Sequence, residues 1–130
     1  MKSAIREYDG KNIDLNRLAD KVQEFFDKQK FKVQRASHPK GIVIQAQKSG
    51  IIRTIFAADQ AITVTITGDP DHVVVRMGVA KWLQDLGVAA IEAIILTPLL
   101  LFIEVPESLW VFETERELWK YLEEQINLGL

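Results

Sequence analysis

Cysteine is absent from this chain of 130 residues, and histidine occurs only twice. Without thiols the chain cannot form disulfides, thiolate nucleophiles, zinc fingers or iron–sulfur clusters. Its seven glycines lie singly at turns, so the glycine-rich loops that bind phosphate are also missing. None of its serines lies in a Gly-x-Ser-x-Gly motif. Nucleophilic catalysis and nucleotide binding are therefore unsupported. We favour a non-enzymatic role and predict neither a cofactor nor a metal ion.

A strong charge of one sign is absent as well. The chain has 16 basic and 18 acidic residues, a net charge of -2. Domains that bind nucleic acid are usually clearly basic, so nucleic acid is not an expected partner. Residues 1–10 mix charges of both signs and lack the apolar core of a secretory signal, which predicts a cytoplasmic location.

The charges are sorted along the chain. Residues 1–50 hold eleven basic and six acidic side chains, a balance of +5, and residues 91–130 hold two and eight, a balance of -6. This pattern favours basic and acidic surfaces that face each other within the fold or across a dimer. A basic patch for an anionic partner is the alternative.

One apolar stripe at helical spacing is present near the N-terminus. Between residues 12 and 28 apolar side chains recur three, four and seven positions apart, which predicts a helix packed on a core. Asn12 or Asp14 can supply the N-cap oxygen for the unpaired amides of its first turn.

The pattern then changes to alternation with a period of two. Apolar and polar residues alternate over 31–37, 42–47, 61–67 and 72–79, and residues 51–57 are rich in β-branched side chains. Short turns between such runs favour antiparallel neighbours, because parallel strands need long crossovers. We predict a single α+β domain over residues 1–130. Its antiparallel four- to five-stranded meander is covered on one face by an N-terminal helix and C-terminal helices. The other face, with Thr63, Thr65 and Thr67 in line near Gln45 and Gln47, is expected to be solvated.

Residues 88–105 form the least usual segment, because only Glu92, Thr97, Pro98 and Glu104 interrupt apolar side chains. A helix of this length extends about 27 Å, slightly less than a hydrocarbon core of about 30 Å. Glu92 and Pro98 disfavour a spanning helix. Three interpretations remain: a core or dimer interface, a membrane attachment, and the lining of a hydrophobic pocket. Residues 99–105 fit a helix and a strand equally well.

The sequence favours a non-catalytic interaction or assembly module that forms a homodimer through residues 88–105. The alternative is a protein that binds a hydrophobic small molecule or a membrane surface through Trp82, Trp110 and the same segment, which would make it membrane-associated. The candidate interface or ligand contacts are Trp82, Ile91, Ile94, Ile95, Leu99, Leu100 and Trp110.

Several charged residues stand among apolar neighbours. An inward-pointing Arg53 or Arg76 would need a carboxylate partner, for which Glu92 and Asp85 are the candidates. The candidate anion or ion-pair site thus comprises Arg53, Arg76, Lys81, Asp85 and Glu92. The aspartates that precede His72 could in principle bind a cation, but residues 69–72 are more typical of a turn.

Overall fold

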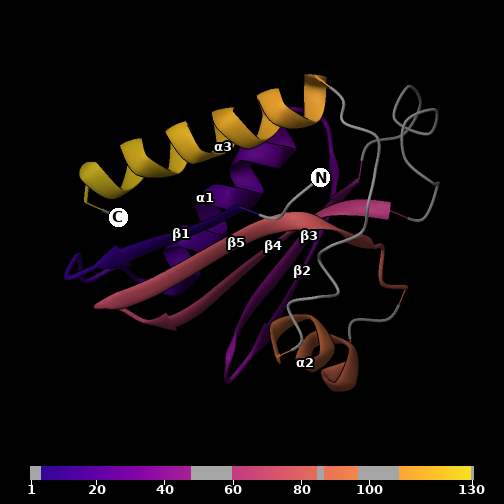
Figure 1. Cartoon of the computed structure of the whole chain (residues 1–130), viewed down its shortest axis with the longest axis horizontal. Helices are drawn as coiled ribbons and strands as arrows, with labels where there is room; N and C mark the ends of the chain where they lie inside the picture. The colour runs from indigo at the N-terminus through magenta and orange to yellow at the C-terminus, as the bar shows by residue number, and fades with distance from the viewer. Residues whose placement is uncertain (1–3, 48–59, 85–86, 97–108, 130) are drawn as a thin grey trace.

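A five-stranded antiparallel sheet forms the centre of the structure, which is a computed structural model (Figure 1). It describes residues 4–47, 60–84, 87–96 and 109–129. The strands are β1 (Ala4–Asp9), β2 (Lys32–His38), β3 (Gly41–Gln47), β4 (Gln60–Asp69) and β5 (His72–Lys81). Their order across the sheet is β1-β5-β4-β3-β2. The predicted α+β class and antiparallel meander are confirmed, with β2 to β5 as the meander.

The edge strand β1 is an element that the sequence did not reveal. It pairs with β5 in a register that places Ile5 opposite Arg76 and Asp9 opposite His72. Charged residues interrupt the alternation that marks the other strands, as is common in edge strands. The predicted strand over residues 51–57 lies outside the described residues.

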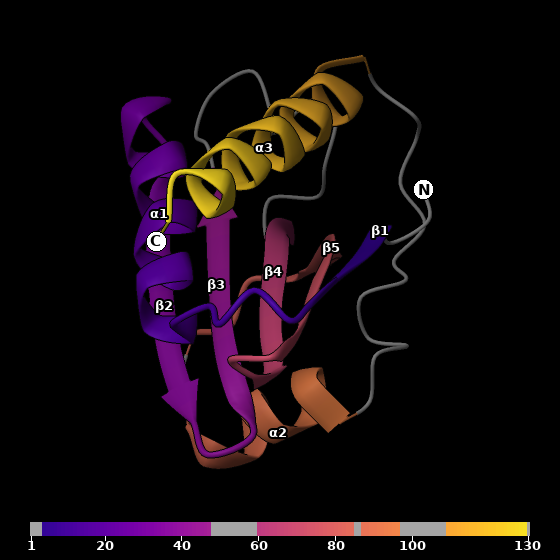
Figure 2. The ribbon, with the colours of Figure 1, turned by 90° about the vertical axis from the view of Figure 1, so that its left-hand side faces the viewer.

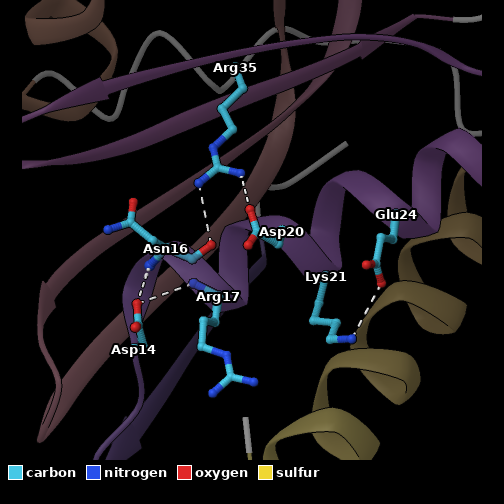
Figure 3. A network of polar contacts seen from close by, with 7 residues as sticks. All are labelled: Asp14, Asn16, Arg17, Asp20, Lys21, Glu24 and Arg35. Atoms are coloured by element: carbon cyan, nitrogen blue, oxygen red, sulfur yellow. Dashed lines mark hydrogen bonds and ion pairs between the residues drawn. The ribbon is translucent and has the colours of Figure 1, made fainter.

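The helix α1 (Leu15–Lys28) follows the predicted stripe. Asp14 is its N-cap: one carboxylate oxygen accepts from the backbone N–H groups of Asn16 at 2.9 Å and Arg17 at 3.2 Å (Figure 3). Arg35 of β2 binds Asp20 and the backbone oxygen of Asn16, which ties the first half of α1 to the sheet.

Replacing the N-cap Asp14 by alanine should lower the free energy of unfolding by about 1 kcal/mol, because two first-turn amides lose their acceptor. Urea unfolding followed by circular dichroism measures the change. Asp27→Ala, near the other end of the same helix, is the control and should change stability little. Equal losses in both variants would contradict a capping role for Asp14.

The main core lies between one face of the sheet and two helices, α1 and α3 (Leu109–Asn127). Figures 1 and 2 show both helices on this face, with α3 crossing beside α1. The helical side chains that are 0% exposed here are Leu18, Ala19, Val22, Phe26, Leu118 and Leu122. They pack on Ile44, Val64, Ile66, Val73 and Val75 from the strands.

The third helix, α2 (Val88–Leu96), lies on the opposite face of the sheet (Figures 1 and 2). There Ile91 and Ile94 pack with Val43 of β3 and Ala80 of β5. Helices therefore cover both faces, and the expectation of a solvated second face was wrong over much of its area. Thr63 is 0% and Thr65 2% exposed. Alternation of threonine with apolar residues does not reveal whether a later apolar segment folds back over the threonines.

Basic residues of the N-terminal part meet α3 within one chain. The Arg6 guanidinium lies 5.5 Å from the centre of the Trp119 ring, and Lys28 lies 5.7 Å from that of Tyr121. Burial raises the pKa of Glu115, and the charge of Arg6 opposes this shift. These cations thus contact aromatic rings of α3, and among the described residues no lysine or arginine of the N-terminal part forms an ion pair with a carboxylate of α3, so the facing of opposite charges stays a prediction.

Candidate functional site

The sheet face beneath α2 carries a buried polar cluster centred on Gln45, which is 0% exposed. The Gln45 amide nitrogen donates to Thr63 Oγ1 at 3.0 Å and to the backbone oxygen of Lys81 at 2.8 Å. The Gln45 amide oxygen accepts from Gln34 Nε2 at 2.8 Å and from the backbone N–H of Leu83 at 2.9 Å. Both donors and both lone pairs of the amide are used. The cluster therefore holds residues 81–83 onto the sheet, and the Gln45 amide has no free donor or acceptor for a ligand.

His38 and Glu92 connect the β2–β3 turn to α2. His38 Nδ1 accepts from the backbone N–H of Lys40 at 3.1 Å, and its Nε2 lies 3.0 Å from a carboxylate oxygen of Glu92. Because Nδ1 is an acceptor, the neutral ring carries its proton on Nε2, and this N–H donates a hydrogen bond to the Glu92 carboxylate. The prediction that Glu92 would pair with Arg53 or Arg76 was wrong for Arg76: β2, not β5, lies beneath this carboxylate.

Arg76 lies near the middle of β5 on the same face as α2. It is opposite Thr65 on β4 and Ile5 on β1. The side chain is half-buried, and its Nε atom is buried with no hydrogen-bond partner. Among the described residues, no carboxylate lies within ion-pair distance of its guanidinium.

The other members of the predicted ion-pair site do not gather around Arg76. Lys81 is exposed at the end of β5, and it is its backbone oxygen that contacts Gln45. Arg53 and Asp85 lie outside the described residues. Of the described members, the structure thus places Arg76, Lys81 and Glu92 in three separate environments.

The turn between β4 and β5 confirms the structural interpretation of its aspartates. One Asp69 oxygen accepts from the backbone N–H groups of Asp71 and His72, both at 3.0 Å. The His72 ring extends toward β1, where Nδ1 contacts the Asp9 carboxylate and Nε2 lies 4.0 Å from Glu7. Among the residues that the structure describes, no group of three or more acidic or histidine side chains is arranged to hold a metal ion.

Acidic neighbours raise the pKa of His72, first through the hydrogen bond and charge of Asp9 and then through Glu7 and Asp69. A pKa higher in the folded state means that folding is favoured by protonation. The stabilisation that protonated His72 gives to the folded state is complete below the pKa of the unfolded chain, near 6.5. It is lost as the pH rises through the higher pKa of the folded state.

We therefore expect the His72 ring to titrate above pH 6.5 in an NMR titration of the ring protons. Asp9→Asn should lower this pKa more than Glu7→Gln does, because Asp9 is the nearer group. A titration unchanged by Asp9→Asn would contradict the assignment of the shift to this contact.

The apolar candidates that the structure describes are buried within one chain. Trp82 is 7%, Ile91 4%, Ile94 2% and Ile95 8% exposed. Lys32 lies 5.2 Å from the centre of the Trp82 ring. Leu99, Leu100 and the side chain of Trp110 lie outside the described part of the chain.

Two exposed apolar residues were not among the predicted contacts. Val88, at the start of α2, is 65% exposed, and Ile5 on the edge strand is 49% exposed. Val88 belongs to the apolar run noted in the sequence, whereas only the pairing of β1 with β5 places Ile5 beside Arg76.

Comparisons with known proteins gave no match: neither a family model, nor a curated protein, nor a solved structure corresponds to this chain. Over the described ranges, none of the helices combines the length and apolar character needed to cross a bilayer.

Proposed function

We propose that this protein is a non-catalytic interaction module that self-associates through the outward surface of α2 and the apolar residues that follow it. The observation that supports this most is the composition of α2. It packs Ile91, Ile94 and Ile95 on the sheet and still presents Val88 and Ala89 to solvent. A surface helix normally carries polar residues on its outer side.

The one charged side chain of α2 does not provide such a polar surface. Glu92 is half-buried and binds His38, so it serves the attachment of the helix to β2. The rest of the described outer surface of α2 consists of Val88 and alanines 89, 90 and 93. An apolar surface of this kind suits a two-fold interface, in which the same patch of each copy meets itself.

The size of the patch limits how much of the interface α2 can form alone. A helix of nine residues is about 14 Å long. A stable dimer buries about 800 Å² on each partner, so the interface must extend beyond α2. Leu99, Leu100 and Trp110 are the sequence-predicted candidates for this extension.

Size-exclusion chromatography with light scattering tests the proposal on the full chain prepared without detergent. We expect twice the chain mass for the wild type and the mass of one chain for Val88→Glu and Ala89→Glu. Leu128→Glu is the matched control, because Leu128 is 79% exposed on another helix end and should leave the dimer intact. A monomeric wild type would overturn the proposal. Ile94 is unsuitable for this test because it is buried against the sheet.

Binding of a hydrophobic ligand or a membrane surface remains the alternative from the sequence. It relied on Trp82 as a contact, yet Trp82 is buried and lies beside Lys32. This burial is the reason that we favour self-association. Recovery of the protein only with detergent, or with a lipid that co-purifies in mass spectrometry, would reverse the preference.

A further inference from the structure

Arg76 is a cation whose charge the described part of the structure does not neutralise. Its Nε–H is buried without an acceptor, although buried polar groups in proteins are nearly always hydrogen-bonded. An unpaired donor of this kind destabilises the fold relative to an apolar side chain of similar size. Of its guanidinium nitrogens only Nε is buried without a partner, and part of the residue remains in solvent, so an acceptor from outside can approach the terminal nitrogens.

The acidic residues of this sheet face are engaged elsewhere. Glu92 binds His38 at one end of the face. At the other end, Asp9 and Glu7 both lie by His72, Asp9 in direct contact and Glu7 at 4.0 Å. Glu7 is opposite Val74 in the register, two pairs along from Arg76 and on the same face, yet no ion pair joins it to the guanidinium. The acceptor that Arg76 lacks is therefore not supplied by these three carboxylates.

The surroundings of Arg76 suit a small planar anion. Thr65, opposite on β4, is 2% exposed, and Gly78, two residues along β5 on the same face, is buried, so a ligand would approach Arg76 from the side of the edge strand β1. Ile5, opposite Arg76 on β1, is exposed and forms an apolar edge beside the guanidinium. The guanidinium has parallel N–H groups that match a carboxylate with two hydrogen bonds.

We propose that Arg76 is the centre of a carboxylate-binding site on the β5 and β1 end of the sheet face. A carboxylate fits better than a phosphate, because a phosphate dianion would meet only one arginine and would share the sheet face with Glu7, two register pairs along β1. The site is separate from the outward surface of α2, so it does not depend on self-association. Its natural ligand is either a free small carboxylate or a carboxylate on an extended peptide whose apolar neighbours contact Ile5.

NMR of the arginine Nε–Hε signals reports on the site directly in the full chain. Sodium acetate, titrated against sodium chloride at constant ionic strength, should shift the Arg76 signal in a saturable manner, with a Kd on the order of 10 mM. The exposed Arg17 on α1 is the internal reference and should not show saturable shifts. A shift of Arg76 no larger than that of Arg17 would overturn the proposal.

Stability provides a second readout that is independent of signal assignment. At ten times its Kd, acetate should favour the folded state by about elevenfold in the wild type and in Arg17→Met. Arg76→Met should lose this gain while remaining at least as stable as the wild type without acetate. Equal stabilisation of Arg76→Met by acetate would contradict the proposal.

Two further ligands identify the source of the carboxylate. N-acetyl-valyl-aspartyl-valinamide should bind at least tenfold more tightly than acetate if the ligand is carried by a peptide, and its asparagine analogue should not bind. Equal affinities of the peptide and acetate would assign the site to a free small carboxylate. Inorganic phosphate that binds Arg76 more tightly than acetate would overturn the assignment to carboxylates. These tests do not involve the oligomeric state, so their failure is distinct from that of the proposed dimer.

Discussion

Replacing Gln45 by leucine should lower the free energy of unfolding by about 3 kcal/mol, although leucine is apolar and similar in size. Gln45 is 0% exposed and makes four hydrogen bonds, two of them with the backbone at Lys81 and Leu83. In the variant these two backbone groups stay near the sheet without a partner. Each unsatisfied buried group costs about 1 to 3 kcal/mol, more than the gain from burying the leucine side chain can offset.

Urea unfolding at neutral pH measures this loss, with Gln34→Leu and Gln23→Leu as controls. Gln34 is half-buried and binds Gln45 and the Leu83 oxygen, so its replacement should cost about 1 kcal/mol. Gln23 lies on the main-core side of the sheet, in α1, and its replacement should have little effect. A loss below 1 kcal/mol in Gln45→Leu would show that residues 81–83 are not held by this amide.

Ile94→Glu should release α2 from the sheet and leave the rest of the fold in place. Ile94 is 2% exposed among Val43, Ala80, Ile91 and Ile95, where an unpaired carboxylate would cost several kcal/mol. Undocking α2 places the new carboxylate in water and gives up the burial of Ile91 and Ile95, worth about 1.5 to 3 kcal/mol each. Undocking costs less free energy than burying the carboxylate, and we expect the free energy of unfolding to fall by about 3 kcal/mol.

Hydrogen exchange followed by mass spectrometry distinguishes local release from global unfolding. Peptides from α2 should lose protection in Ile94→Glu, while those from α1 and β3 keep it, because the main core lies on the other face of the sheet and β3 stays paired with β2 and β4. Leu128→Glu, which lies outside the proposed interface and is 79% exposed, is the control and should preserve the protection of all these peptides. Equal loss in α1 would show that α2 folds as one unit with the main core.

The predictions that held came from patterns within single segments. The stripe of Leu18, Val22 and Phe26 predicted α1 and its buried side, and Asp14 was one of two proposed caps. Alternation predicted β2 to β5, with short turns that made them antiparallel. Local periodicity determines these features, because a helix or strand places its side chains by its own geometry.

The predictions that failed, and the features that the sequence did not reveal, depend on contacts between distant segments. Glu92 binds His38 rather than Arg76 because α2 lies over β2, β3 and β4, which no pattern in residues 88–96 indicates. Gln45 and Thr63 were expected to face solvent, but both are buried: Gln45 donates to Thr63 Oγ1 and accepts from the backbone N–H of Leu83. The sequence by itself determined α1, the strands β2 to β5 and the main core; only the tertiary structure decided the pairing of the edge strand β1 and which face α2 covers. The free energy of docking α2 depends on the side chains that it meets on the sheet, such as Val43 and Ala80. The periodicity of the helix itself does not specify these partners.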